Sequence, residues 1–393
     1  MIHISPETQA FIQAHTTDDV RLLALQNKKY PQVDMSMAMI QIAGRQAAIE
    51  KLPTWSKTES IWYPRHLSLE QCSSETTARY KATLVQGETF TDLTGGFGID
   101  CFIISQRFNS ATYVERQEEL CEIAAHNAPL LGLRNMSVEN KDAVAYLQDM
   151  QPVDCIFIDP ARRNEHGGKT VVISDCEPDV GNLEGLLLEK AGQVLIKLSP
   201  MLDLSLALKE LKYTKEVHIV SVNNECKELL LLLEKGTFET IPVHCINLTS
   251  KGEQHFTFTS AQEQNNDCRY TASVESYLYE PNASILKAGA FRSTASVYEL
   301  KKLHPNSHLY TSNQFIKSFP GRVFRVTGQC SFNKKEMKEI LRDIRKANLT
   351  VRNFPESVAE LRKRMKISDG GNVYLFATTL NNNQKVLIRC EKV

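Results

Sequence analysis

The sequence predicts an α/β protein built on a parallel sheet, with a helical region before the sheet and an α+β region after it. Three observations lead to this prediction. A glycine-rich turn follows a β-branched and aromatic stretch at residues 89–93, strand-like and helix-like segments alternate up to residue 260, and the pattern changes after residue 272. Alternation of strands with helices is the usual sequence pattern of a parallel sheet.

The composition is that of an ordinary globular protein. The 393 residues suffice for two or three domains, and 42% hydrophobic against 23% charged residues allow a large core. Lys+Arg and Asp+Glu number 46 each, so no whole-chain field attracts nucleic acid or a membrane, and any such site must be local. The ten cysteines show no C-x-x-C spacing, so we expect neither a zinc site nor another metal.

The sequence also favours a cytoplasmic location. The N-terminus lacks the basic stretch and apolar run of a signal peptide. The longest apolar stretch, residues 229–233, is far shorter than the roughly 20 residues of a membrane span. Cysteines without a disulfide framework indicate a reducing compartment. We therefore expect a soluble cytoplasmic protein that does not associate with membranes.

Residues 1–85 are predicted to form a helical domain. Helices are expected at residues 6–12, 20–25 and 37–51. Pro53 is expected to stop the third of them, and residues 52–67 to form a loop. The polar run at residues 71–77 lies just before the glycine-rich turn, so it either roofs a ligand or forms a capped surface helix.

The glycine-rich turn reads D-L-T-G-G-F-G, from Asp92 at the end of the predicted strand through Gly95 and Gly96 to Gly98. Glycine lets backbone approach a ligand closely, and the helix expected at residues 99–108 would point free N–H groups at that ligand. The spacing is neither the G-x-G-x-x-G of a dinucleotide site nor a P-loop. It resembles the first motif of class I S-adenosylmethionine (AdoMet) methyltransferases, although a turn without a ligand stays possible.

This resemblance implies the cofactor-binding residues of the turn. Asp92 would lie near the methionine end of AdoMet, with Gly96 and Gly98 against the cofactor. Thr94, at a position often held by glycine, and Gly95 complete the predicted cofactor-binding turn.

The next two strands each end near an acidic residue. Glu115 ends the strand at residues 111–115, about 20 residues past the turn, where an acid accepts both ribose hydroxyl protons of an adenosine. The alternative is an acid favoured by a helix dipole. After the strand at residues 136–139, Asp142 and Ala143 resemble the place where methyltransferases hold the adenine amino group. Asp142 is equally a good N-cap for the helix expected at residues 143–150.

A second motif, Asp159-Pro160-Ala161-Arg162, follows the apolar strand at residues 154–158. The carboxyl ends of such strands are where α/β sheets bind ligands. The tetrad resembles the D/N-P-P-Y/F/W or D-P-P-R motif of methyltransferases that act on exocyclic base amino groups. In that chemistry a carboxylate and a rigid proline carbonyl accept the two amine hydrogens, which restores the lone pair of the nitrogen; Asp159 and Pro160 would serve here.

The tetrad departs from the family pattern at two positions. Ala161 replaces the second proline, and Arg162 replaces a stacking aromatic; a guanidinium group either stacks on a base or binds phosphate. The target atom therefore stays open, as does a plain strand-ending turn. The loop expected at residues 164–182 is long enough for a lid or a substrate loop.

The sheet is expected to continue with strands at residues 193–198 and 217–222. Residues 227–233 fit a helix or a strand, and we predict the antiparallel seventh strand that closes a methyltransferase sheet. The methyltransferase domain is placed at residues 86–260, and residues 260–272 are expected to be a linker.

The end of the chain reads as a basic α+β region. From Pro320 onward it has 16 Lys and Arg against 7 Asp and Glu. Many of these cations lie along a helix that is expected at residues 334–347, with Asn333 as its cap. Charged helical faces usually serve solubility. Positive charge segregated beside a base-amino methylation motif favours nucleic-acid binding instead.

The whole chain resembles the bacterial THUMP-like methyltransferase family. The segments SLEQCSSETTARYKA and YLYEPNASILKAGAF carry this resemblance outside DLTGGFG and DPAR. It implies a Rossmann-like class I methyltransferase sheet, a ferredoxin-like module at residues 273–320 and a THUMP-like module at residues 321–393. It also implies AdoMet-dependent methylation of a base amino group, guanine N2 or adenine N6, in tRNA or rRNA. Two alternatives stay open: an RNA-binding protein with a degenerate, non-catalytic methyltransferase domain, and a methyltransferase of DNA, protein or a small molecule.

Overall fold

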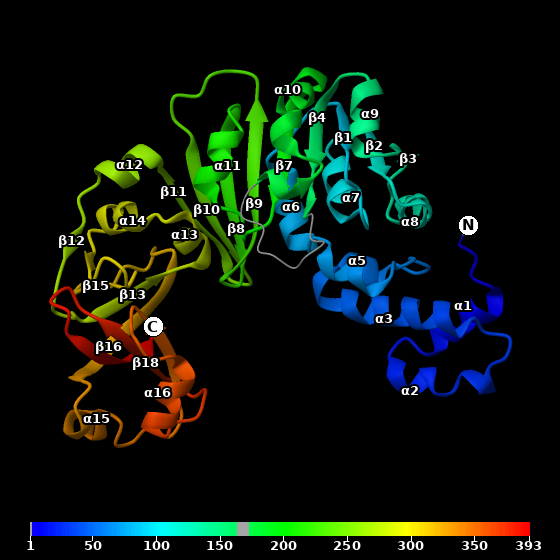
Figure 1. Ribbon diagram of the computed structural model, residues 1–393. Coiled ribbons are helices and arrows are strands. Elements are labelled where there is room, and N and C mark those ends of the chain that lie inside the picture. Colours follow the sequence, from blue (N-terminus) through cyan, green and yellow to red (C-terminus); the bar gives the residue numbers. More distant parts are fainter. Residues whose placement is uncertain (1, 163–172) are drawn as a thin grey trace. The chain divides into compact units, whose positions relative to one another are not determined.

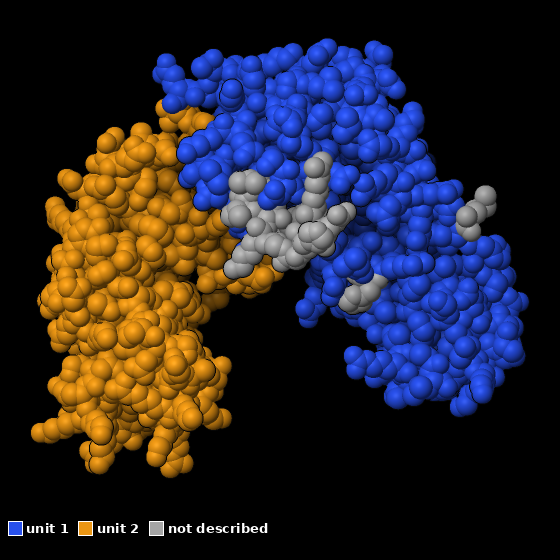
Figure 2. Space-filling model, viewed as in Figure 1, with its two compact units in different colours: residues 1–216, 229–239 blue, residues 217–228, 240–393 orange. Residues whose placement is uncertain are grey.

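The computed structural model describes residues 2–162 and 173–393. It has two compact units, residues 1–216 with 229–239 and residues 217–228 with 240–393 (Figure 2). The division cuts strand β8 between Glu216 and Val217, which remain neighbours along one strand. None of the helices in the described part of the chain is long and apolar enough to cross a membrane.

The first unit begins with helices, as predicted, which are drawn in blue in Figure 1. They are α1 (Pro6–Ala14), α2 (Val20–Ala24), the 3₁₀ turn η1 (Asn27–Lys29), α3 (Met35–Lys51), α4 (Pro53–Lys57), α5 (His66–Gln71) and α6 (Glu75–Thr83). Phe11, Leu23 and Ile42 pack in their common core. The loop expected after Pro53 is partly wrong: Pro53 opens α4, because the first residue of a helix needs no N–H donor.

A parallel sheet follows. Five of its strands are parallel to one another and lie wholly in the first unit: β1 (Thr89–Asp92), β2 (Ser110–Glu115), β3 (Met136–Asn140), β4 (Val153–Ile158) and β7 (Ala191–Leu198). Between them run α7 (Ile99–Ser105), α8 (Glu118–Leu130), α9 (Ala143–Asp149) and α10 (Val180–Lys190) (Figure 1). Strand β1 pairs in parallel with β2 and with β4, so the loops after these three strands leave the sheet at the same edge.

The leucine run is a strand, as predicted. Strand β9 (Glu225–Glu234) pairs antiparallel with β7, from Gln193 opposite Glu234 to Leu198 opposite Leu229. Its five leucines are at most 2% exposed, as in a strand that is covered on both faces. The chain adds α11 (Leu204–Glu210), β8 (Thr214–Val222), β10 (Pro242–Thr249) and β11 (Gly252–Thr259). The strand order of the sheet is β11-β10-β8-β9-β7-β4-β1-β2-β3.

The Asp-Pro motif leads into a small strand pair. Strand β5 (Ala161–Arg162) pairs antiparallel with β6 (Cys176–Glu177), after the short 3₁₀ turn η2 (Ile173–Asp175). Of the long loop predicted at residues 164–182, residues 164–172 lie outside the described residues, and the rest contains η2, β6 and the start of α10.

The second unit contains a separate sheet in the order β12-β14-β15-β13-β16-β19-β18-β17. Its elements are α12 (Ser260–Asn265), β12 (Arg269–Tyr270), β13 (Tyr277–Pro281), α13 (Ala283–Ala288), α14 (Phe291–Val297), β14 (Lys301–Lys302), β15 (Tyr310–Ser312), β16 (Gly321–Ser331), α15 (Lys334–Ile340), β17 (Asn348–Arg352), α16 (Val358–Met365), β18 (Val373–Thr379) and β19 (Lys385–Lys392). Strands from both sides of residue 320 therefore share one sheet.

Two expectations for this unit are wrong. The predicted linker at residues 260–272 contains α12, whose capping box joins Thr259 and Gln262, because the polar residues of an exposed helix look like those of a linker. The helix expected at residues 334–347 begins at the predicted cap, Asn333, but ends at Ile340. The last cations of that segment therefore lie after the helix and not on it.

One buried carboxylate joins three strands of the second sheet. Glu280 on β13 is 2% exposed and accepts hydrogen bonds from Arg322 on β16, at 2.8 Å from Nε, and from Arg352 on β17, at 2.7 Å. A buried charge needs such partners, because leaving it unpaired would cost several kcal/mol.

Candidate functional site

Two residues of the glycine-rich turn have the left-handed backbone conformation that favours glycine. Gly96 and Gly98 have φ angles of +55° and +89°, and Gly98 is the N-cap of α7. An added Cβ at Gly95 would lie 2.2 Å from the Tyr113 ring, whereas at Gly96 the nearest atom would be the Thr94 carbonyl oxygen at 3.8 Å. Packing thus requires glycine at position 95, while Gly96 faces open space that a ligand can fill.

Asp92 presents a buried carboxylate beside this space. It is 1% exposed, and its Oδ1 accepts the Thr94 N–H at 2.9 Å. Its Oδ2 is buried without a hydrogen-bond partner among the described residues. Burial raises the pKa of Asp92 well above its usual range, and the charges of Asp100, Asp159 and Glu115 add to the shift. A cationic amino group brought by a ligand would satisfy this oxygen.

Glu115 lies against the same turn. Its Oε2 accepts the Gly96 N–H at 3.0 Å, and its Oε1 accepts the N–H of Gln117, the N-cap of α8, at 2.9 Å. The carboxylate therefore supports the start of α8 and also reaches the turn. Each carboxylate oxygen keeps a second lone pair, so two ribose hydroxyls can still donate to it.

Asp142 caps α9, which was one of its two predicted roles. Its Oδ1 accepts the N–H groups of Val144 and Ala145 at 2.9 and 3.1 Å, and Ala143 is the first residue of the helix. The end of β3 is joined to the end of β2, because Asn140 Nδ2 donates to the Glu115 carbonyl oxygen at 2.9 Å. The cap leaves Asp142 Oδ2 for a second role at this edge.

The Asp-Pro motif is bonded directly to the glycine-rich turn. The Asp159 N–H donates to Thr94 Oγ1 at 2.7 Å, and that hydroxyl lies 3.5 Å from Asp92 Oδ1. The threonine that departs from the glycine of the family motif thus connects the loops after β1 and β4. Pro160 is buried and Ala161 is exposed. The side chain of Arg162 lies outside what the structure describes.

Three residues at this edge were not predicted from the sequence. Lys197, near the end of β7, contacts Asp159 Oδ2 and lies 4.0 Å from Asp100 Oδ2. Asp100 in turn accepts the Ser73 hydroxyl at 2.6 Å and lies 3.1 Å from Nζ of the fully buried Lys81. A lone lysine inside the apolar strand QVLIKL was the available indication for Lys197.

The polar run before the turn is not a surface helix. Glu75, Thr77 and Lys81 of α6 are buried, and Ser73 and Lys81 contact Asp100 at the start of α7. The N-terminal helical region therefore holds the helix that carries the glycine-rich turn. Of the two predictions for this run, the surface helix is wrong.

A cavity of about 290 Å³ in the same unit has no part in this site. It is lined by Pro152, Val153, Leu188 and Gly192, at the start of β4 and β7, which is the opposite edge of the sheet. Ligands of parallel sheets bind at the carboxyl edge, where the glycine-rich turn and the Asp-Pro motif meet.

Fold and site together define a class I methyltransferase: a mainly parallel sheet in which the antiparallel strand β9 lies between β7 and β8, a glycine-rich turn after β1, and acidic residues at or just after the ends of the first four strands. The comparisons agree. Residues 277–320 match the model of a ferredoxin-like domain and residues 321–392 that of a THUMP-like domain. No curated protein sequence matches the chain.

Solved structures identify the family. A candidate methyltransferase of Porphyromonas gingivalis W83 shares 35% identity over 100% of both chains, with a TM-score of 0.90. The chain belongs to the family of this protein, the S-adenosylmethionine-dependent methyltransferases with a THUMP-like C-terminus.

More distant structures match less than half of this chain. A candidate methyltransferase of Escherichia coli, yhhF, shares 19% identity over 41% of this chain and 85% of its own, with a TM-score of 0.31. An rRNA methylase of Streptococcus thermophilus shares 13% identity over 41% of this chain and 94% of its own, also with a TM-score of 0.31. These two likenesses are too remote to support an argument about function.

Proposed function

We propose that the protein transfers a methyl group to an exocyclic amino group of an RNA base, guanine N2 or adenine N6, in tRNA or rRNA. One observation carries the proposal: the hydrogen bond of 2.7 Å from the Asp159 N–H to Thr94 Oγ1. It brings the motif that would hold the amine next to the turn that would hold the donor. Both are then positioned for direct transfer, which depends on orientation more than on acid–base chemistry.

The donor would be held by the residues around the glycine-rich turn. The open space at Gly96 and the buried Oδ2 of Asp92 fit the methionine part of AdoMet, and Glu115 fits its ribose. Asp142 would meet the adenine amino group with its free oxygen. Thr94, Gly95, Gly98 and Ala143 shape this surface without a charge of their own. Bound AdoMet would supply an electrophilic methyl group on its sulfonium.

The acceptor would be held by the Asp-Pro motif. A base amino group is a poor nucleophile because its lone pair is delocalised into the ring. Lys197 contacts Oδ2 of Asp159 and fixes the orientation of the carboxylate, which leaves Oδ1 to accept one amine hydrogen. The Pro160 carbonyl would accept the other. Arg162 would stack on the base or bind its phosphate.

The RNA would bind to the THUMP-like region through its exposed positive charge. Four arginines of this region are in ion pairs with carboxylates: Arg322, Arg352, Arg362 and Arg364. The cations of α15 and of the segment that follows it are exposed: Lys334, Lys335, Lys338, Arg342, Arg345 and Lys346. Exposed cations bind phosphates with release of the counterions of the RNA, which supports α15 and the segment after it as the RNA-binding surface.

We also place the protein in the cytoplasm. All ten cysteines are free thiols, and seven of them are buried in the core. A reducing compartment keeps thiols in this state.

The proposal is tested first on RNA from a strain that lacks the gene. Mass spectrometry of its nucleosides should show one methylated base missing, and purified protein with labelled AdoMet should restore it. RNA binding without methyl incorporation would instead identify a binding protein with a degenerate domain. Faster methylation of DNA, protein or a small molecule would move the substrate to another class.

Two substitutions separate the donor role from the acceptor role. Asp159→Ala should abolish methyl transfer and change calorimetric AdoMet binding by less than about threefold, because donor contacts remain. Glu115→Gln should weaken AdoMet binding about 10–100-fold, since a hydrogen bond to a charged group is worth about 1.5–3 kcal/mol. Glu118→Gln, an exposed change three residues further on at the start of α8, is the control and should bind AdoMet normally. Equal AdoMet binding by both glutamine variants would contradict the donor site.

A further inference from the structure

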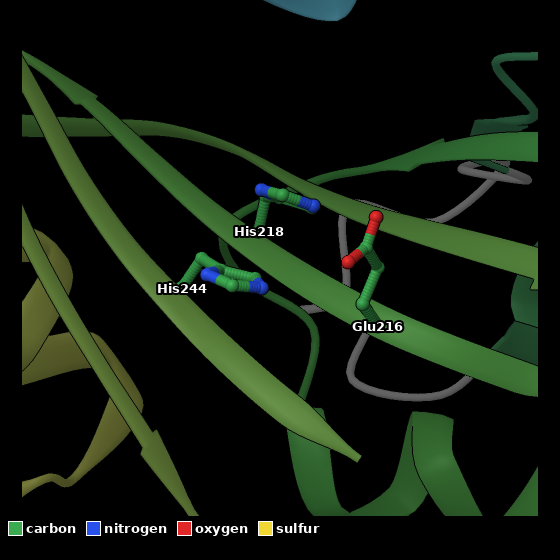
Figure 3. Close-up of side chains that lie close together, drawn as sticks. All are labelled: Glu216, His218 and His244. Atoms are coloured by element: carbon green, nitrogen blue, oxygen red, sulfur yellow. The ribbon is translucent and has the colours of Figure 1, made fainter. Parts of the chain in front are cut away.

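A cluster of metal-ligand side chains lies outside the residues that the proposed methyl transfer uses. Glu216, His218 and His244 each offer one ligand atom, and these atoms lie within 4.8 Å of one another. Figure 3 shows the two imidazole rings and the carboxylate projecting from the same side of two neighbouring strands and turned toward one another.

Strand geometry explains why these three residues meet. Glu216 and His218 are two residues apart on β8, so their side chains leave the same face of that strand. Strand β10 runs parallel to β8, and its register places His244 directly beside His218. The two rings are stacked, with centroids 4.6 Å apart and an angle of 17° between their planes. The cluster is therefore fixed by backbone pairing and needs no loop to form it.

The surroundings of His244 resemble the outer shell of a metal ligand. Its Nδ1 lies 3.0 Å from Thr257 Oγ1 and 3.3 Å from His255 Nε2, both on β11. Ligating histidines usually donate one ring N–H to such a group, which fixes the tautomer and leaves the other nitrogen to bind the metal. Donation from Nδ1 would assign this role to Nε2 of His244.

The ligand set and its spacing suit a transition metal. Imidazole and carboxylate ligands select zinc and its neighbours over magnesium or calcium. Donors on a tetrahedral zinc are about 3.4 Å apart, given bonds of about 2.0–2.2 Å. Small side-chain rotations bring atoms that now lie within 4.8 Å to that spacing. His218 is only 5% exposed, whereas Glu216 and His244 are half-buried. Solvent therefore reaches the cluster mainly beside Glu216 and His244.

We propose that Glu216, His218 and His244 form a binding site for a zinc ion, with a fourth coordination position open to water or another ligand. The sequence predicts that the protein has no metal site, and this prediction rests on the spacing of the cysteines. This site uses no cysteine, and its histidines lie on strands whose pairing the sequence pattern does not reveal. The proposal does not depend on the methyl-transfer reaction, because it shares no residue with the donor or acceptor site.

The test is metal binding by the full-length protein after chelator treatment and dialysis. Titration calorimetry with zinc chloride should give one tight site. Cobalt(II) should give the visible absorption of nitrogen and oxygen ligands without the thiolate bands that binding to cysteines would produce. His244→Ala should weaken zinc binding at least about 100-fold, and Glu216→Gln at least about tenfold. His255→Ala should weaken it about tenfold, as loss of an outer-shell partner does.

His3→Ala is the control, because His3 is exposed and belongs to no such cluster. It should bind zinc like the unsubstituted protein. His218→Ala should also lose the site. If circular dichroism shows that this buried change unfolds the protein, zinc binding by the His244→Ala and Glu216→Gln variants tests the proposal instead. Zinc binding that is absent, that shows thiolate bands, or that survives both His244→Ala and Glu216→Gln would overturn the proposal.

Discussion

The Lys197 ammonium contacts Asp159 Oδ2 at the carboxyl edge of the sheet. The same ammonium lies 4.0 Å from Asp100, on the helix that follows the glycine-rich turn. One cation thus stands between the loop that would hold the acceptor and the helix that carries the donor turn. It brings a positive charge to a site in which the charges of Asp100, Glu115 and Asp159 all act on the carboxyl group of Asp92.

Lys197→Met should therefore impair catalysis more than donor binding. Without the ammonium, the Asp159 carboxylate loses the contact that orients it toward the amine. Turnover should fall about 10–100-fold, the value of one hydrogen bond between charged groups. AdoMet affinity, measured by calorimetry, should change by less than about threefold. Lys215→Met removes another strand lysine from its pair with Glu234 and is the matched control. Turnover that falls equally in both variants would refute a specific role for Lys197.

Substitutions at two adjacent glycines should separate binding from stability. Gly96→Ala places a methyl group in the open cradle at a left-handed φ, so AdoMet affinity should fall at least about tenfold, with a loss of only about 1–2 kcal/mol in stability. Gly95→Ala drives its Cβ into the Tyr113 ring and should lower the melting temperature more. Calorimetric titration and thermal melts measure the two effects. Normal AdoMet binding by Gly96→Ala would mean that the donor lies elsewhere.

Asp92 should make the stability of the protein depend on pH. Its folded-state pKa is raised, so the folded protein holds a proton that the unfolded chain releases near pH 4. The stability gained from that proton is complete below the unfolded pKa and is lost as the pH rises through the folded pKa. Asp92→Asn removes this loss. Its melting temperature relative to the unsubstituted protein should therefore increase from pH 5 to pH 8, while AdoMet binding is lost. A difference that is constant with pH would show that Asp92 does not titrate in this way.

The exposed lysines at the start of α15 should contribute to RNA affinity through charge alone. Lys334→Glu/Lys335→Glu should weaken RNA binding and reduce the dependence of affinity on salt by about two phosphate contacts. Lys28→Glu/Lys29→Glu makes the same charge change on two exposed lysines of the N-terminal region. Filter-binding titrations at several salt concentrations compare the two. An equal loss of affinity in both double variants would indicate an effect of net charge and not a surface on α15.

The sequence sufficed for those parts of the fold and site that depend on neighbouring residues. The strand that ends at Asp92 and the caps at Asp142 and Asn333 follow from local chemistry, and the structure confirms them. The antiparallel leucine strand was also predicted, although only through the family resemblance, because its apolar run fits a helix equally well.

What the sequence did not reveal depends on pairing across the fold. Lys197 becomes a partner of Asp159 only because β7 lies beside β4, and Lys81 reaches Asp100 only because α6 packs on α7. The bridging role of Thr94 likewise needs the loop after β4 next to the loop after β1. Polar composition was misleading at α12 and α6, since buried and exposed helices can share the same polar residues.

The two arginines on Glu280 bear on how this family could have been assembled. The carboxylate lies before residue 320, within the ferredoxin-like match, while Arg322 and Arg352 lie after it, within the THUMP-like match. A gene fragment that began at Gly321 would encode both guanidinium groups and lack the acid that they share. The two matched segments are therefore poor candidates for independent exchange between proteins, and evolution would have to move them as a single inherited piece.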